Sequence, residues 1–293
     1  MAHYIYIFGK LDDWDCIEKR GNPVASPLVR GYLSFVQGEQ RRVRVGVKQA
    51  PQLVAVQLRE LVCYMRRCAQ TLPTAAERIA MIRDVAIFCV AFHTTKRGFE
   101  LSVAVASQVW QMSGGEGFIS NFLFGKTLQN SSHAVVVKKN QDCPEICAVA
   151  TMVEYQQAAE SMQWSLAKGS RFLFPTVLED REKEDVALTA VQMTTSLHAH
   201  LRAAGMEYKR YTMHSFRVGG AASHKMDGTA MGVLIEYVGW KSAVVARRYV
   251  GATASAAAAA GVKRSRKTAF IEGDALPLSK QFARSYTAFR GAN

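Results

Sequence analysis

The sequence lacks the features that would place it in a membrane, in the secretory pathway or around a metal ion. None of its apolar runs approaches the roughly 20 residues that span a bilayer. Residues 1–5 carry neither a basic stretch nor a small-residue cleavage site. The closest pairs among the six cysteines, at 63/68 and 143/147, lack zinc-site spacing, and no histidine pair accompanies them. We therefore expect no membrane partner, no metal, no small-molecule cofactor, and reduced cysteines in an intracellular protein.

Acidic residues are scarce relative to basic ones. Lysine and arginine number 37 against 24 aspartates and glutamates, which gives a formal net charge of +13. Such an excess favours a polyanionic partner, because neutralising phosphates releases their condensed counterions. Charge alone leaves open a protein that is merely basic and soluble. The length of 293 residues and the hydrophobic fraction of 49% indicate a globular protein of one large domain or two ordinary ones.

Helical periodicity dominates the chain and predicts a mostly α fold. Ser26 is a predicted N-cap, and Pro27 directly after it occupies the first helical position, where proline is favoured. Thr74 and Glu77 form a predicted capping box. Helices are expected to start at Pro27, Pro51 and Pro144, to cover 74–95 and 99–110, and another helix is expected to end at Gly205. Three short helices are expected near the end of this region, over 214–225, from Thr229 to Gly239, and from Ser242 through Tyr249.

One segment breaks the helical pattern. Residues 118–127 and 134–138 are typical of two strands, and the polar residues 129–132 between them are typical of a turn. The fold class is therefore mostly α with one small antiparallel β-sheet (α+β). No internal repeat is present.

The chain divides by composition into a short helical region with a linker (1–50), a main domain (51–250) and a tail (251–293). The linker contains a basic strip that is either a solvated loop or a hinge that follows DNA phosphates. The strip consists of Arg41, Arg42, Arg44 and Lys48. A second basic cluster, over 263–267, is compatible with a nuclear-import signal or a DNA-backbone contact.

The most informative motif is His214-Ser215-Phe216-Arg217. His214 and Arg217 are three residues apart, so both side chains project from one face of a helix. Such a pair alone is common, but Trp240 follows Arg217 by twenty-three residues and Tyr249 follows Trp240 by nine. The run Val-Gly-Gly-Ala directly after Arg217 has small residues that let another segment pack closely.

Together with the upstream Arg97 and Lys126, this order and spacing resembles the active site of the tyrosine recombinase (phage integrase) family. The run His-Ser-Phe-Arg-Val-Gly-Gly-Ala resembles recombinases of eukaryotic DIRS-like and Crypton-like mobile elements more than bacterial integrases. The resemblance covers roughly residues 51–250. It implies the tyrosine recombinase catalytic-domain fold, double-stranded DNA as partner, and self-association to a tetramer on DNA. Residues 1–50 would be a short, truncated form of the family's N-terminal DNA-binding region, and 251–293 an inter-subunit exchange segment. A eukaryotic host would place the protein in the nucleus.

The resemblance assigns roles in one reaction, the cutting and rejoining of DNA through a 3′-phosphotyrosine. Tyr249 is the nucleophile and His214 is its general base. Arg97 and Arg217 hold the phosphate through bidentate contacts, so no metal is required. Lys126, on the predicted hairpin, is the general acid for the leaving 5′ oxygen.

Two further residues support this set. Glu100, three after Arg97, is expected to buttress an arginine or the histidine by a charge-assisted hydrogen bond. Trp240 stands where many family members carry histidine, and its indole N–H can only donate, which predicts a hydrogen-bonding and structural role. Lys138 and Lys139 on the return strand compete with Lys126. Lys96 is expected to be a solvated residue at the start of a helix, and Tyr237 is expected to pack against the core.

Two alternatives stay open. A type IB topoisomerase uses the same chemistry as a monomer, and strand transfer between two duplexes would distinguish it from a recombinase. A non-enzymatic DNA-binding remnant would form no covalent adduct with DNA.

Overall fold

The protein is described by a computed structural model. The described residues are 26–42, 50–123, 125, 132–161, 172–177, 186–240, 242–247 and 249–250, with the backbone alone at 37 and 40–42. The chain forms two compact units, Met1–Gln49 and Ala50–Asn293. Within the described part of the first unit lies helix α2 (Pro27–Arg42), which confirms the helix predicted from Pro27. Across the described ranges, no helix combines the length and apolarity needed to cross a membrane.

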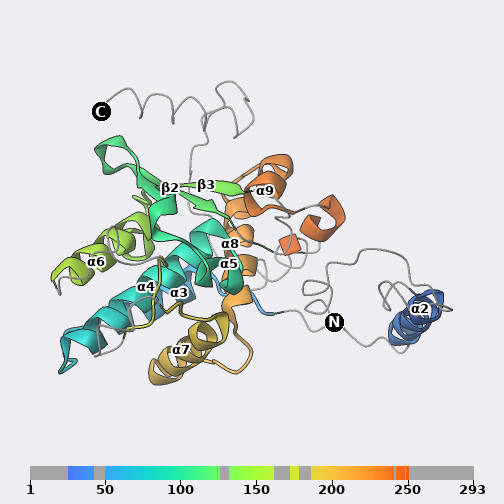
Figure 1. Ribbon diagram of the computed structural model, residues 1–293, viewed down its shortest axis with the longest axis horizontal. Helices are drawn as coiled ribbons and strands as arrows, with labels where there is room; N and C mark the ends of the chain where they lie inside the picture. The colour runs from blue at the N-terminus through green and yellow to red at the C-terminus, as the bar shows by residue number, and fades with distance from the viewer. Residues whose placement is uncertain are drawn as a thin grey trace. The chain divides into compact units, whose positions relative to one another are not determined.

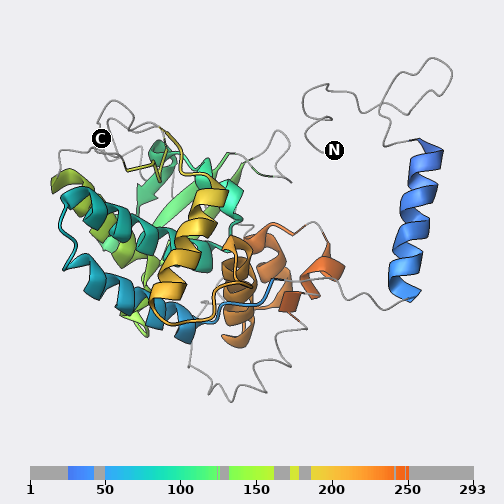
Figure 2. The same ribbon diagram turned by 90° about the horizontal axis from the view of Figure 1, so that it is seen from below.

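Helix α4 is the centre of the second unit. Its continuous buried stretch, 83–92, is apolar from residue 85 onward and packs against neighbours on all sides, as expected for a helix in the core. It packs against α3, α6 and α8, and Figures 1 and 2 show α8 and α9 at the end of the unit opposite α6. The main helices of this unit are α3 (Ala55–Ala69), α4 (Ala75–Thr94), α6 (Ala148–Ser161), α7 (Ala190–Ala203), α8 (Met213–Met226) and α9 (Met231–Val238).

A three-stranded antiparallel sheet lies beside these helices, in the order β1 (Val109–Gln111), β2 (Gly117–Phe122) and β3 (His133–Lys138). The register pairs Gly117 with Lys138 and Phe122 with His133. The predicted small antiparallel sheet is thus confirmed, with one more strand than the sequence suggested.

The helix predicted over 99–110 is wrong. Helix α5 covers only Gly98–Ser102, and a 3₁₀ turn leads the chain into β1. β-Branched residues recur in this stretch, and Val105 forms a bridge with Phe172 while Trp110 pairs with Ile119. These pairings with distant segments favour extended backbone over helix.

Local capping signals predicted some helix starts and missed others. The box at Thr74 is confirmed, since the Glu77 N–H donates to Thr74 Oγ1 at 3.2 Å and the Thr74 N–H donates to Glu77 Oε2 at 3.2 Å. Helix α3 begins at Ala55 instead of Pro51, because the chain before it is extended and the Leu53 N–H donates to the Ser215 carbonyl. The N-cap of α9 is residue 230, one position later than predicted.

Two glycines let α8 lie directly on neighbouring main chain, as their small size predicted. A Cβ added to Gly219 would lie 1.9 Å from the Leu53 carbonyl oxygen, and one added to Gly220 would lie 1.9 Å from the Phe92 carbonyl oxygen. No side chain fits at these distances. This contact fixes the first turns of α8 against the C-terminal end of α4.

Replacing Gly220 by alanine should therefore destabilise the protein, by about 1–3 kcal/mol or more, because the clash is with backbone that cannot turn away. Gly232→Ala in α9 is the control, since its Cβ would meet nothing within 4 Å. There, alanine should stabilise the helix by about 0.5–1 kcal/mol. Denaturant midpoints of the two variants measure the difference, and equal midpoints would contradict this account of the α8 packing.

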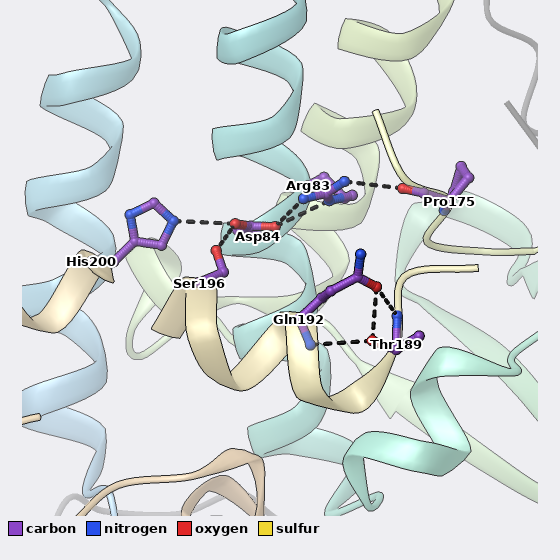
Figure 3. Close-up of polar contacts among 7 residues, drawn as sticks. All are labelled: Arg83, Asp84, Pro175, Thr189, Gln192, Ser196 and His200. Atoms are coloured by element: carbon purple, nitrogen blue, oxygen red, sulfur yellow. Dashed lines mark hydrogen bonds and ion pairs between the residues drawn. The ribbon is translucent and has the colours of Figure 1, made fainter. Parts of the chain in front are cut away.

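A buried polar network ties α4 to α7 away from the predicted site (Figure 3). Asp84 accepts hydrogen bonds from Arg83 and Ser196, and from His200 Nε2 at 3.1 Å. Arg83 in turn donates to the Pro175 carbonyl at 3.0 Å. Burial would raise the pKa of Asp84, but the hydrogen bond from His200 and the charge of Arg83 outweigh it and the pKa is lowered. Through Asp84 and Arg83, the network links α4 to α7 and to the segment that contains Pro175.

Candidate active site

The start of α8 presents two of the predicted residues. Thr212 is the N-cap, and its side chain accepts the His214 N–H at 3.2 Å. His214 and Arg217 consequently stand in the first turns of the helix, on the side that faces the segment around Trp240 and Tyr249.

Tyr249 lies against His214. Residues 243–247 and 249–250 are helical, and Ser242 Oγ accepts the Val244 N–H at 3.2 Å, so the predicted cap is confirmed. His214 Nε2 is 2.8 Å from the Tyr249 hydroxyl oxygen. Burial, and then the charges of Arg217 and Arg97, lower the pKa of His214. A neutral imidazole, which can accept the phenolic proton, is therefore the dominant form at neutral pH.

Arg217 is fully buried behind this pair. Its Nη1 donates to the Thr95 carbonyl at 2.6 Å and its Nη2 to the Val238 carbonyl at 3.3 Å. Burial, together with the charge of Arg97, lowers its pKa to about 10, so the guanidinium remains charged at neutral pH. Its Nε has no hydrogen-bond partner within the described part of the chain.

Trp240 closes the other side of the cluster. Its ring centroid is 5.3 Å from that of Tyr249, and the Arg217 guanidinium carbon is 5.7 Å from the indole. The indole Nε1, like Arg217 Nε, is buried and bonded to nothing among the described residues. Two buried N–H donors thus stand beside the tyrosine. Unsatisfied buried donors are costly, so both N–H groups are candidates to bind an anion.

Arg97 is held by Glu100. The Arg97 N–H donates to Glu100 Oε2 at 2.8 Å, and Arg97 Nη1 donates to Glu100 Oε1 at 2.9 Å. Glu100 is buried, while the Arg97 side chain is 30% exposed. The turn before Arg97 contains Thr95 in the left-handed region (φ 55°). This conformation is unfavourable for a β-branched residue, and it directs the Thr95 carbonyl to Arg217.

Lys96 departs from its prediction. The sequence suggested a solvated lysine, yet Lys96 is only 2% exposed. Its Nζ lies 2.5 Å from His133 Nδ1 and 5.0 Å from the centroid of the Phe122 ring. Sequence reasoning missed both Lys96 and His133, because lysine is rarely buried and the partner is on a distant strand.

The other predicted residues cannot be placed. Lys126 lies outside the described residues, in the connection between Phe122 of β2 and His133 of β3. From the basic strip, Arg44 and Lys48 also lie outside the described residues, and of Arg41 and Arg42, at the end of α2, only the backbone is described.

Basic side chains outnumber carboxylates around Arg217 within the described ranges. Arg97, Lys96 and Arg217 are basic, and Glu100 is the carboxylate that affects the pKa values of both Lys96 and Arg217. The described ranges contain no group of three His, Cys, Asp or Glu side chains placed to hold a metal ion. The arrangement is suited to an anion that carries oxygen acceptors.

Comparisons with known proteins bear on the fold. No protein-family model matches the chain, and no curated protein matches it. Among solved structures, it is similar to the XerH site-specific recombinase bound to palindromic difH substrate in a post-cleavage complex, with 15% identity and a TM-score of 0.53 over 73% of this chain. The pre-cleavage complex of XerH with difH gives 16% identity and a TM-score of 0.51 over 74% of this chain. The matches span 53% and 55% of those two chains. The prediction of a mostly helical tyrosine recombinase catalytic-domain fold is confirmed.

Proposed function

We propose that this protein is a site-specific recombinase or integrase that cuts and rejoins double-stranded DNA through a 3′-phosphotyrosine on Tyr249. The observation that carries the proposal is the Tyr249 hydroxyl 2.8 Å from His214 Nε2, next to the unpartnered donors of Arg217 and Trp240. The similarity in fold to a DNA-bound recombinase and the net charge of +13 support DNA as the partner.

The first chemical step forms a bond between the Tyr249 oxygen and phosphorus and breaks the bond from phosphorus to the 5′ oxygen. The phenolic proton passes to His214 Nε2, whose lowered pKa leaves it free to accept. The 5′ oxygen takes a proton from Lys126, the group that the family resemblance assigns. Religation reverses each transfer. A neutral phenol is a weak nucleophile, so in this proposal His214 takes the proton as the oxygen–phosphorus bond forms.

The arginines and the indole hold the phosphate in this proposal. Arg217 Nε and Trp240 Nε1 each donate to a non-bridging oxygen, and Arg97, fixed by Glu100, reaches the same group from the turn that precedes α5. Preorganised donors of this kind stabilise the charge that develops in the transition state. Arg97 and Arg217 beside the Glu100 carboxylate leave positive charge for the phosphate to neutralise.

The biological setting is proposed from the family resemblance. The run His-Ser-Phe-Arg-Val-Gly-Gly-Ala favours a recombinase of a mobile element of the DIRS-like or Crypton-like kind. Such a protein works as a tetramer on two duplexes, in the nucleus of a eukaryotic host. The separate compactness of Met1–Gln49 supports a distinct DNA-binding region before the catalytic domain.

A nicked suicide substrate tests the proposed function directly. DNA that loses a short 5′ fragment after cleavage cannot be religated, so the covalent protein–DNA adduct should accumulate and appear as a retarded band on a denaturing gel. The adduct should form in the presence of a chelator and without a nucleotide, because the phosphodiester energy is kept in the phosphotyrosine. A strict requirement for magnesium in cleavage would contradict the proposal. Transfer of the cut strand to a second duplex would separate a recombinase from a topoisomerase.

A further inference from the structure

Lys96 is a buried lysine that forms no ion pair with a carboxylate among the residues that the structure describes. It is 2% exposed, and its Nζ contacts His133 Nδ1 and the face of Phe122. The nearby Glu100 directs both of its oxygens to Arg97. The His133 ring also bonds the Glu236 backbone, and its Cε1 and Nδ1 would be 3.1 Å from a Cβ at residue 239. Lys96 therefore connects the Arg97 turn, strand β3 and the turn that precedes Trp240.

The groups around Lys96 disfavour its charge in the free protein. Burial is the main cause that lowers the pKa of Lys96 to about 7. Glu100 on α5 raises this pKa, and Arg217 on α8 and Arg97 lower it further. His133 on β3 is neutral at pH 7, because burial and the proximity of Lys96 lower its own pKa to about 4, so it contacts Lys96 without supplying a negative charge. A methionine of similar length would remove this electrostatic penalty, so packing alone does not explain a lysine here.

A bound phosphate would favour the charged form of Lys96, which the free protein disfavours. The Arg217 guanidinium on α8 donates to the carbonyl of Thr95, the residue just before Lys96, so it contacts the turn of the chain that contains Lys96. An anion at the unpartnered donors of Arg217 and Trp240 would stabilise a positive charge on Lys96 as well.

We propose that Lys96 is a third cationic group of the phosphate site, held by His133 and fully charged when the scissile phosphate is bound. The inference rests on the proposed function, because it requires a phosphate beside Tyr249. Lys96 acts as a positioning residue that supplies charge from behind the arginines, and its proton comes from solvent.

This role predicts proton uptake on DNA binding. Below about pH 7, Lys96 is already charged in the free protein, so its contribution to affinity does not change. Above that pH, the free protein loses the proton and the complex keeps it, so affinity should fall as pH rises, by up to about tenfold per pH unit. His214 does not titrate in this window, because its pKa is lowered from an ordinary value of 6.5.

Lys96→Met tests the proposal, with Lys225→Met as the matched control. Lys225 is exposed on α8, so its loss changes the net charge equally without touching the site. Relative to wild type, Lys96→Met should form the adduct about tenfold more slowly at pH 7, less than the loss for a group that touches the phosphate. Its binding to nicked duplex, followed by fluorescence anisotropy, should lose the fall in affinity between pH 7 and 9. Lys225→Met should keep both wild-type properties.

Thermal unfolding separates this role from a structural one. A lysine whose pKa is lowered by folding opposes folding most below about pH 7, and less as pH rises towards its ordinary value of 10.5. Lys96→Met should therefore melt at least as high as wild type at pH 6, with the gap narrowing towards pH 9. A clearly lower melting temperature at pH 6 would overturn the proposal.

The remaining outcomes are distinct. A wild-type protein that forms no adduct would overturn the proposed function and this inference with it. A Lys96→Met variant that cleaves and binds like wild type from pH 6 to 9 would overturn the inference alone. Rescue of that variant by a substrate with sulfur as the 5′ leaving atom would also overturn it, because such rescue identifies a proton donor.

Discussion

Replacing Tyr249 by phenylalanine should abolish the covalent protein–DNA adduct and leave DNA affinity nearly unchanged. The substitution removes only the hydroxyl that lies 2.8 Å from His214 Nε2. The ring keeps its packing against Trp240, at 5.3 Å between centroids, and against His214, at 5.6 Å. A denaturing gel with the suicide substrate measures the adduct, and anisotropy with intact duplex measures affinity.

Tyr237→Phe is the control for this variant. The Tyr237 hydroxyl donates to the His93 carbonyl at 2.8 Å, and burial raises its pKa, so it is a poor nucleophile held in the core as the sequence predicted. Its loss should reduce the free energy of unfolding by about 1 kcal/mol and leave the adduct intact. An adduct that persists in Tyr249→Phe would move the nucleophile to another residue and refute the proposed mechanism.

The sequence predicted elements that depend on local chemistry. The box at Thr74, the glycine that ends α7 and the apolar spacing of α3 each act within a few residues, so they could be recognised without tertiary information. The wrong predictions of secondary structure fall where contacts with distant segments determine the backbone conformation. Residue 105 pairs with Phe172 and residues 109–111 pair with β2, so the helix predicted over 99–110 does not form. Residues 51–54 become extended through contact with α8.

The candidate site divides in the same way. The spacing of His214, Arg217, Trp240 and Tyr249 was visible because these residues recur in a family pattern, and the structure brings them together. The burial of Lys96 could not be predicted from the sequence. It depends on the left-handed turn at Thr95 and on a histidine 37 positions later, and neither has a signal in the local sequence.

Removing either arginine should have the second large effect. Arg97→Ala and Arg217→Ala should each lower the cleavage rate by about 10²–10³-fold, the usual loss when one preorganised charge-stabilising group is removed. Lysine should restore only part of the rate at either position, because a single ammonium cannot keep the bonds that hold each guanidinium in place and also donate to the phosphate. Single-turnover cleavage of the suicide substrate measures each rate. Arg202→Ala on α7 is the control, since Arg202 is exposed and its loss changes the net charge equally.

The two arginines should differ in their effect on stability. Arg217 is buried and donates to the Thr95 and Val238 carbonyls, so Arg217→Ala leaves two buried acceptors unpaired. Each should reduce the free energy of unfolding by about 1–3 kcal/mol. Arg97 is 30% exposed, and in Arg97→Ala the Glu100 carboxylate keeps its bond from the backbone N–H of residue 97. Arg97→Ala should thus stay folded yet cleave slowly, which makes it the cleaner measure of phosphate binding. Wild-type cleavage by Arg97→Lys or Arg217→Lys would show that the replaced arginine acts only as a charge, and its assignment as a directed hydrogen-bond donor to the phosphate would be wrong.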